Sequence, residues 1–265
     1  MKNRNLIAFF SIIFSLILFW GLFYLLGHYL SYQNWFSLYG KAHQSFDIKH
    51  NLQRPTANRF LNFVYSPLEA HMRRYGMISL EDSVAGIFVD LKYSSIDNFA
   101  ETDMYGTLNK AMAHPLLASR LRRARALLKI RRPDLEFIVF DVARPKSIQF
   151  KLWEKLKDHP DRKKYVSSPD NGSYHNLGLA IDLSLADTSG NLIDMGCRYD
   201  YFGEEAHITY EELLVKKTLI KEHALENRRL LREIMVISGF KTLSSEWWHF
   251  YLNEKGSLPT LTIIP

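Results

Sequence analysis

The sequence contains a single cysteine, Cys197, in a chain of 265 residues. An internal disulfide needs two thiols and a cysteine-based zinc site usually needs four, so both are excluded. Any metal ion must therefore be held by histidine and carboxylate side chains. Cysteine usage does not assign a compartment, because a chain without a pair of thiols is tolerated in reducing and oxidising environments alike.

The sequence also lacks basic residues interleaved with aromatic ones, although its formal net charge is +6. Its lysines and arginines are spread along the chain, which is not the pattern of a nucleic-acid platform, so we expect no nucleic-acid partner. Internal repeats and low-complexity stretches are absent as well. With 47% apolar residues, the length suits one membrane element and one domain of about 200 residues.

Residues 6–30 contain no Asp, Glu, Lys or Arg. As a helix, this run is long enough to span a bilayer core of roughly 30 Å. It is longer than the apolar core of a signal peptide and has no Ala-x-Ala cleavage pattern, which favours an uncleaved transmembrane anchor. Lys2 and Arg4 precede the run and the next basic residue is Lys41. The positive-inside rule then predicts a cytoplasmic N-terminus at 1–5.

This topology predicts a single-pass protein of the inner or plasma membrane, with its globular part in the periplasm or outside the cell. Residues 31–80 are mixed and polar, which indicates a juxtamembrane connector with a short helix near 68–75. We expect one domain from 81 to 265.

Alternating and helical patterns follow one another through this domain. Leucines at helical spacing predict a helix over 114–130, with a basic face that we expect to be solvated. Strict alternation predicts a strand over 179–185. Further strands are predicted at 86–94, 136–142 and 247–252, and further helices at 146–157 and 211–238. This order predicts an α+β domain with a central antiparallel sheet flanked by helices, preceded by one N-terminal transmembrane helix.

The first motif of chemical interest places His175 and Asp182 seven positions apart around Gly178. Seven extended residues span roughly 23 to 25 Å, so one metal ion binds both side chains only if the chain folds back between them. Gly178 provides a bend for this purpose. Asp182 lies on the polar face of its predicted strand, where a carboxylate must be solvated, paired or coordinated.

The second motif places Glu246 and His249 three positions apart among four aromatic residues. In a flat strand these two side chains point to opposite faces, so shared chemistry requires a turn or bulge where the strand begins. The aromatic neighbours would keep water away from such a site.

Together these residues predict a catalytic zinc centre. His175, Asp182 and His249 supply three ligands and leave the fourth tetrahedral position of one zinc ion per chain for water. Zinc lowers the pKa of that water to about 7, and Glu246, which is not a ligand, is positioned to take its proton. Arg144, held by Pro145, is the predicted stabiliser of the oxyanion.

These motifs resemble those of the VanX-type D-alanyl-D-alanine dipeptidases. That family belongs to the zinc D-Ala-D-Ala peptidases, which share the fold of the Hedgehog signalling domain. Its Ser-x-His-x-x-Gly-x-Ala-x-Asp stretch matches Ser173–Asp182, and its Glu-x-Trp-His stretch matches Glu246–His249. The resemblance covers about 90–252. Three further stretches favour the dipeptidase branch: 90–99, 140–145 and 194–200.

The resemblance implies the same three zinc ligands, Glu246 as general base and acid, and Arg144 as the group that stabilises the transition state. It also implies that Asp200, and with it Ser173, anchors the free ammonium end of a dipeptide. Such an anchor explains why an enzyme accepts dipeptides and refuses longer chains. Ala143 departs from the family, in which an aromatic residue often precedes the arginine, and this implies a wider pocket wall.

The expected partner is a small D-amino-acid dipeptide or a peptidoglycan fragment. Two alternatives remain open at this point. A D,D- or L,D-carboxypeptidase that trims peptidoglycan stem peptides is favoured by the outward topology. A non-catalytic, zinc-containing wall-binding module is the other, although such a module needs neither Glu246 nor Arg144.

Overall fold

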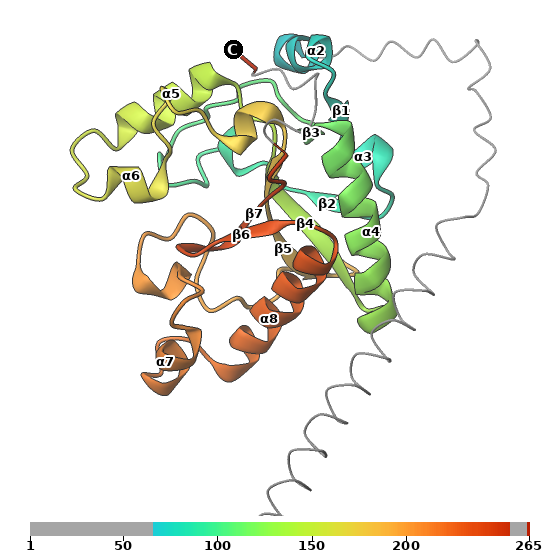
Figure 1. Cartoon of the computed structure of the whole chain (residues 1–265), viewed down its shortest axis with the longest axis vertical. Coiled ribbons are helices and arrows are strands. Elements are labelled where there is room, and N and C mark those ends of the chain that lie inside the picture. Colours follow the sequence, from blue (N-terminus) through green and yellow to red (C-terminus); the bar gives the residue numbers. More distant parts are fainter. Residues whose placement is uncertain (1–65, 255–263) are drawn as a thin grey trace, which may run out of the picture. The chain divides into compact units, whose positions relative to one another are not determined.

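The core of the chain is built on a sheet of five strands in the order β2-β4-β5-β7-β6 (Figure 1). The structure is a computed structural model that describes residues 66–254 and 264–265. The strands of this sheet are β2 (Phe88–Val89), β4 (Leu135–Asp141), β5 (Ala180–Asp187), β6 (Lys241–Leu243) and β7 (Glu246–Tyr251). Two short strands, β1 (Ile78–Ser79) and β3 (Met112–Ala113), form a separate antiparallel pair.

Two long helices, α4 (Pro115–Arg131) and α8 (Glu222–Ile237), pack against each other and against the sheet (Figure 1). Every residue of β4 is buried, and so is every residue of β5 except the last. The remaining helices are α2 (Pro67–Arg74), α3 (Leu80–Ser83), α5 (Lys146–Lys155), α6 (Arg162–Tyr165), α7 (Glu211–Lys216) and the 3₁₀ helices η1 (Lys92–Ser94), η2 (Tyr174–Leu177) and η3 (Glu204–Ala206).

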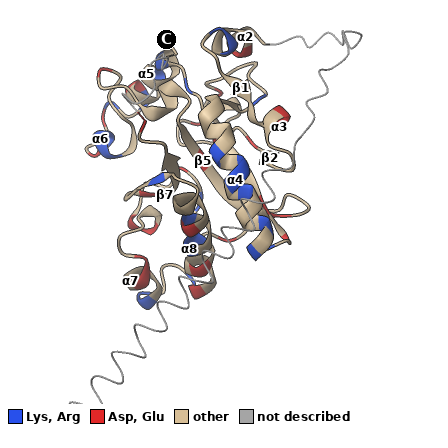
Figure 2. Cartoon of the chain, turned by 45° about the vertical axis from the view of Figure 1, so that its right-hand side comes forward, with Lys and Arg blue, Asp and Glu red and all other residues tan. Residues whose placement is uncertain are grey.

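Helix α4 forms where the leucine spacing predicts it. Pro115 occupies its first turn, where a missing N–H costs nothing, and the ring of His114 accepts a hydrogen bond from the Leu116 N–H. Its leucines are buried except Leu116, which is partly exposed, and its basic residues form bands on the outer face (Figure 2). Arg125 pairs with Glu136 at 2.8 Å, so part of this face is neutralised within the fold.

Most other predicted elements are confirmed, with boundaries shifted by a few residues. The predicted strand at 86–94 is shorter, because only Phe88–Val89 pairs with a neighbour. The predicted helix over 211–238 is two helices, α7 and α8. The helix is interrupted between them at Thr218. The φ of Thr218 is 59°, in the left-handed region, and this conformation does not continue the helical hydrogen bonding.

Two parts of the predicted architecture are wrong. The sheet is mixed rather than antiparallel, because β2 runs parallel to β4. The other part is the transmembrane helix, because no helix within the described residues has the length and apolarity needed to cross a membrane. The run 6–30, on which the predicted anchor and its membrane localisation rested, lies outside these residues. The described architecture is therefore an α+β domain without a spanning helix.

The fold-back between the two halves of the first motif occurs at Gly178. Helix η2 ends there with φ of 62° and ψ of 24°, the left-handed conformation that glycine adopts without strain. A Cβ at this position would lie 2.5 Å from the sulfur of Met77 and 2.8 Å from the backbone nitrogen of His114. The site therefore requires glycine for conformation and for space.

We predict that Gly178→Ala lowers the free energy of unfolding by about 2 to 4 kcal/mol, the sum of a left-handed alanine and of overpacking. Gly106→Ala is the matched control, because Gly106 has φ of 60° with nothing within 4 Å of its Cβ position. It should cost only the conformational part, about 1 to 2 kcal/mol. Denaturant unfolding measures both, and equal losses would contradict the role of close packing at Gly178.

Candidate metal centre and active site

Two strands and one 3₁₀ helix bring the three predicted metal ligands together. Asp182 on β5 lies directly opposite His249 on β7, and η2 carries His175 to the same point. The donor atoms of the three residues all lie within 4.8 Å of one another. His175 Nε2 is 3.4 Å from His249 Nδ1, and His249 Nδ1 is 2.9 Å from Asp182 Oδ1.

These separations fit a metal ion in tetrahedral coordination. Bonds of about 2.0 to 2.1 Å at a tetrahedral angle place neighbouring donor atoms about 3.3 Å apart. His175 Nδ1 lies 2.5 Å from the carbonyl oxygen of Val142, which fixes the ring and leaves Nε2 for the metal. Burial lowers the pKa of His249, which favours the neutral imidazole that metal binding requires.

Asp182 is held as a carboxylate by the two histidines. Burial alone would raise its pKa, but electrostatic and hydrogen-bond interactions with His175 and His249 outweigh burial and lower it. A buried carboxylate between two imidazoles is the ligand chemistry of a histidine-rich metal site.

Glu246 begins β7 beside this centre. The pairing of β6 with β7 is irregular here, with Thr242 opposite Phe250 and Leu243 opposite Glu246. This irregularity turns Glu246 towards the ligands, and its Oε2 lies 3.7 Å from His249 Nδ1. Burial raises the pKa of Glu246 well above its ordinary value, and the negative charges of Asp182 and Asp200 raise it further. A carboxylate in that environment readily accepts a proton.

Arg144 is buried next to the metal ligands, with its Nη2 3.9 Å from Asp182 Oδ2. Its Nε donates to Asp141 Oδ2 at 2.9 Å, Nη2 donates to the same oxygen, and Nη1 donates to Gln149 Oε1 at 2.9 Å. Burial lowers the pKa of Arg144, but electrostatic interactions with Asp141 and with three neighbouring tyrosines together outweigh burial and raise the pKa. The guanidinium is therefore a fixed cation.

Asp200 has one carboxylate oxygen without a partner. Its Oδ1 accepts a hydrogen bond from the Tyr93 hydroxyl at 3.3 Å, whereas Oδ2 is buried and makes no hydrogen bond to the described protein. Burial, followed by the charge of Asp182, raises the pKa of Asp200 to about 7. An unsatisfied buried carboxylate oxygen is costly unless a ligand supplies a donor.

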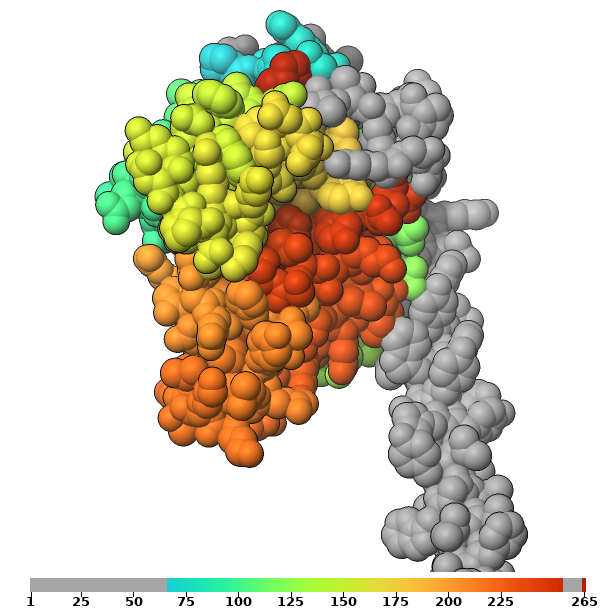
Figure 3. Space-filling view, turned by 60° about the vertical axis from the view of Figure 1, so that its left-hand side comes forward, coloured from blue at the N-terminus to red at the C-terminus, as the bar shows by residue number. Residues whose placement is uncertain are grey.

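All seven predicted site residues line one cavity of about 320 Å³. Ser173 contributes from the start of η2, where its Oγ also accepts a hydrogen bond from the His175 N–H at 3.2 Å. The walls include the α6 segment, the loop at 200–202 and β7. Figure 3 shows these regions adjoining on one face, in yellow, orange and red respectively.

Several residues at the site were not found from the sequence. They are Asp141 and Gln149, which hold Arg144, and three tyrosines whose hydroxyls reach acids of the site: Tyr93, Tyr105 and Tyr199. Asp141 had a local signal, because it stands three positions before Arg144. Each tyrosine is far along the chain from the acid to which it donates, so the spacing of residues in one sequence does not predict these hydrogen bonds.

Several known proteins are similar in sequence to this chain over most of the described residues. Residues 73–262 match the family described as D-Ala-D-Ala dipeptidase. The D-alanyl-D-alanine dipeptidase of Escherichia coli (strain K12) is 32% identical over 173 residues, which cover 65% of this chain and 82% of that protein. The enzyme of the same name from Enterococcus faecium is 32% identical over 200 residues, covering 68% and 93%.

A third relative, the D-alanyl-D-alanine dipeptidase of Streptomyces coelicolor, is 29% identical over 197 residues, which cover 66% of this chain and 91% of that protein. The family match spans most of the described residues and includes both motifs and all three metal-ligand candidates. The chain therefore belongs to the D-Ala-D-Ala dipeptidase family of metallopeptidases and is a hydrolytic enzyme.

Proposed function

We propose that this enzyme hydrolyses the D-alanyl-D-alanine dipeptide with one zinc ion held by His175, Asp182 and His249. The convergence of these three donors beside Glu246 is the observation that carries the proposal. Two imidazoles and one carboxylate are the donor set of a catalytic zinc site that keeps one position open. When bound, zinc supplies a water of lowered pKa and polarises the scissile carbonyl group.

The protein contributes proton transfer and charge stabilisation. Glu246 takes a proton from the attacking water and delivers it to the leaving amine, a task that suits a carboxylate whose pKa is raised by burial. Arg144 stabilises the negative charge that develops on the carbonyl oxygen, because its guanidinium is already fixed by Asp141 and needs no reorganisation.

Asp200 selects the length of the substrate. Asp200 lines the cavity with one carboxylate oxygen unpartnered, and its carboxylate receives the ammonium group of the dipeptide, with Ser173 lining the same cavity. An N-terminally extended peptide would place a neutral amide there and leave the buried carboxylate without a cation.

The substrate panel that tests this function consists of D-Ala-D-Ala, L-Ala-L-Ala and a stem pentapeptide ending in D-Ala-D-Ala. We expect the zinc-loaded full chain to cleave the first, with kcat/KM for the pentapeptide lower by a factor on the order of 10³ or more, because the pentapeptide lacks the free ammonium. Release of D-Ala from the pentapeptide with the dipeptide left intact would replace the proposal by a carboxypeptidase activity.

Replacing the proposed base separates turnover from metal binding. We expect Glu246→Gln to lower kcat by about 10²- to 10⁴-fold, because general base catalysis is lost, while metal analysis still finds one zinc ion per chain. Glu212→Gln is the control, since the Glu212 side chain is 82% exposed and does not line the cavity. An unchanged kcat in Glu246→Gln would remove Glu246 from the mechanism.

The ionisation of Asp200 should depend on the metal. In the metal-free protein we expect its carboxyl group to titrate with a pKa of about 7, and zinc should lower that value because it compensates the charge of Asp182. Carbon NMR of labelled aspartate measures both values, with Asp200→Asn assigning the signal. Because only the ionised form attracts ammonium, kcat/KM should fall as the pH drops through the pKa of Asp200 in the metal-loaded enzyme. A metal-free pKa near the ordinary value of about 3.9 would contradict this account.

A further inference from the structure

Three buried tyrosines surround the acids of the active site, and each donates its hydroxyl hydrogen to a different one. Tyr199 donates to Asp182 Oδ2 at 3.1 Å, Tyr93 to Asp200 Oδ1 at 3.3 Å, and Tyr105 to Asp141 Oδ1 at 2.6 Å. The exposed fractions of Tyr93, Tyr105 and Tyr199 are only 2%, 4% and 8%. No acid receives two of these hydroxyls.

The charge balance of the site explains why neutral hydroxyl groups, rather than cations, donate to these acids. Asp141, Asp182, Asp200 and Glu246 gather around one buried guanidinium, that of Arg144. Each carboxylate lost its hydration on burial and needs donors in place of water. More cations would supply donors but would compete with the metal ion and with the substrate's ammonium group. A phenol supplies a donor without charge.

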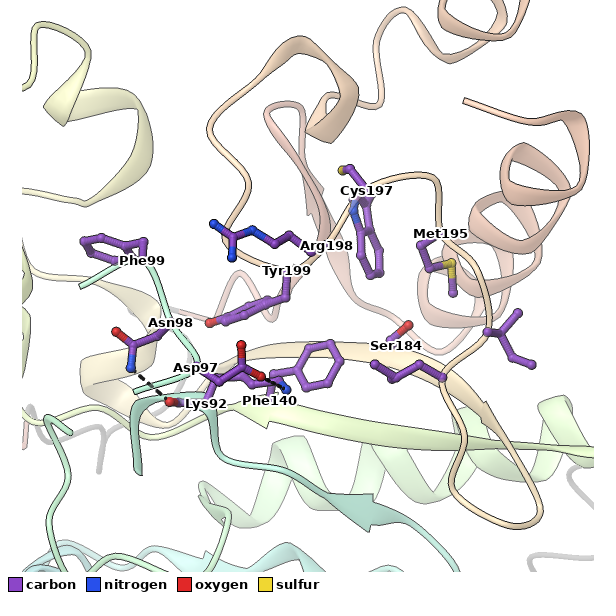
Figure 4. A pocket seen from close by; sticks show the side chains of 13 residues that line it. Lys92, Asp97, Asn98, Phe99, Phe140, Ser184, Met195, Cys197, Arg198 and Tyr199 are labelled. Atoms are coloured by element: carbon purple, nitrogen blue, oxygen red, sulfur yellow. Dashed lines mark hydrogen bonds and ion pairs between the residues drawn. The ribbon is translucent and has the colours of Figure 1, made fainter. Parts of the chain in front are cut away.

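Tyr199 acts on the metal ligand. Its hydroxyl holds Asp182 Oδ2, while Asp182 Oδ1 faces His249 Nδ1 at 2.9 Å. The Tyr199 ring is fixed by packing against Phe140 at 5.1 Å and Trp248 at 5.3 Å between ring centroids. Tyr199 also lines a second cavity of about 160 Å³, together with Phe140 (Figure 4).

The other two tyrosines act on the groups that contact the substrate. Tyr93 stands at the centre, with its ring 6.0 Å from that of Tyr105, 6.3 Å from that of Tyr199, and 5.0 Å from Arg144 Cζ. Burial raises the pKa of Tyr93 and of Tyr105 well above the ordinary value, and the adjacent carboxylates Asp200 and Asp141 raise each further. Both hydroxyls therefore remain donors throughout the working pH range.

We propose that Tyr199, Tyr93 and Tyr105 are positioning residues with separate tasks, which rest on the proposed function. Tyr199 orients the metal ligand Asp182, Tyr93 orients Asp200 towards the substrate's ammonium group, and Tyr105 orients Asp141 and through it Arg144. Each task belongs to a different measurable quantity: metal affinity, KM and kcat.

The test is one substitution made at three places in the full-length enzyme. Tyr199→Phe, Tyr93→Phe and Tyr105→Phe each remove one oxygen atom from a buried ring, so each variant is the matched control for the other two. Zinc affinity is measured by competition with a chromophoric chelator, and kinetics with D-Ala-D-Ala are measured at saturating zinc. Near-UV circular dichroism and thermal unfolding verify the fold, and Tyr→Met replaces any phenylalanine variant that fails to fold.

We expect three different phenotypes. Tyr199→Phe should weaken zinc binding by about 10- to 100-fold, the usual effect of losing a partner of a metal ligand. Tyr93→Phe should raise KM by about tenfold with kcat retained, and Tyr105→Phe should lower kcat by about tenfold with KM retained, since each loses one hydrogen bond to a charged group. Loss of the same quantity in all three variants, or unchanged zinc affinity in Tyr199→Phe, would overturn the inference.

A measurement that does not depend on catalysis tests the roles of the tyrosines separately from the proposed function. In the metal-free protein, each phenylalanine variant should change the carboxyl carbon chemical shift of its own aspartate and leave those of the other two unchanged. If the wild-type chain bound zinc but did not cleave D-Ala-D-Ala, the proposed function would fail while these shifts and the zinc affinities would still test the tyrosines. Equal changes at all three aspartates would show that the rings act only as a packed unit and would sink the proposal.

Discussion

The pairing of β5 with β7 is the constraint on which the rest of the site depends. It sets Asp182 directly opposite His249, so the backbone pairing of the two strands places two of the proposed metal ligands side by side. The fold-back at Gly178 then brings His175 to the same point, and the irregular pairing of β6 with β7 turns Glu246 towards it. A shift of one residue in the β5–β7 register would move Asp182 to the other face of the sheet.

Burial of several acids around this point creates a problem that the fold resolves with neutral donors. Arg144 is the single buried cation in direct contact with the acids of the described site, and it is committed to Asp141. Tyrosine hydroxyls donate to one oxygen each of Asp141, Asp182 and Asp200, whereas Asp200 Oδ2 has no partner. The negative potential is thereby preserved for the metal ion and the ammonium group, which are the two cations that the reaction brings into the cavity.

The sequence predicts those parts of the fold and of the site whose residues lie close together along the chain. His175, Asp182, Glu246 and His249 lie in two short motifs, and the need for a bend at Gly178 follows from chain length alone. The tyrosine pairings span 17 to 107 positions, and the parallel partner of β2 lies about 50 residues away, so neither leaves a local pattern. The interruption between α7 and α8 was not predicted for a different reason. The apolar periodicity continues through it, and a threonine gives no indication in the sequence that Thr218 adopts a left-handed backbone conformation.

The proposed function implies that the metal site and the ammonium site are coupled through Asp182. Burial, followed by the negative charge of Asp182, raises the pKa of Asp200 to about 7, so a large fraction of Asp200 is protonated at neutral pH in the metal-free protein and the attraction for ammonium is weaker. A bound metal ion offsets the charge of Asp182 and thereby favours the ionised form of Asp200. By linkage, the dipeptide must then favour the metal-bound state by the same factor. Tyr93 donates to Asp200, Tyr199 donates to Asp182, and the two rings are in edge contact, so the positions of the two acids are linked through packed side chains.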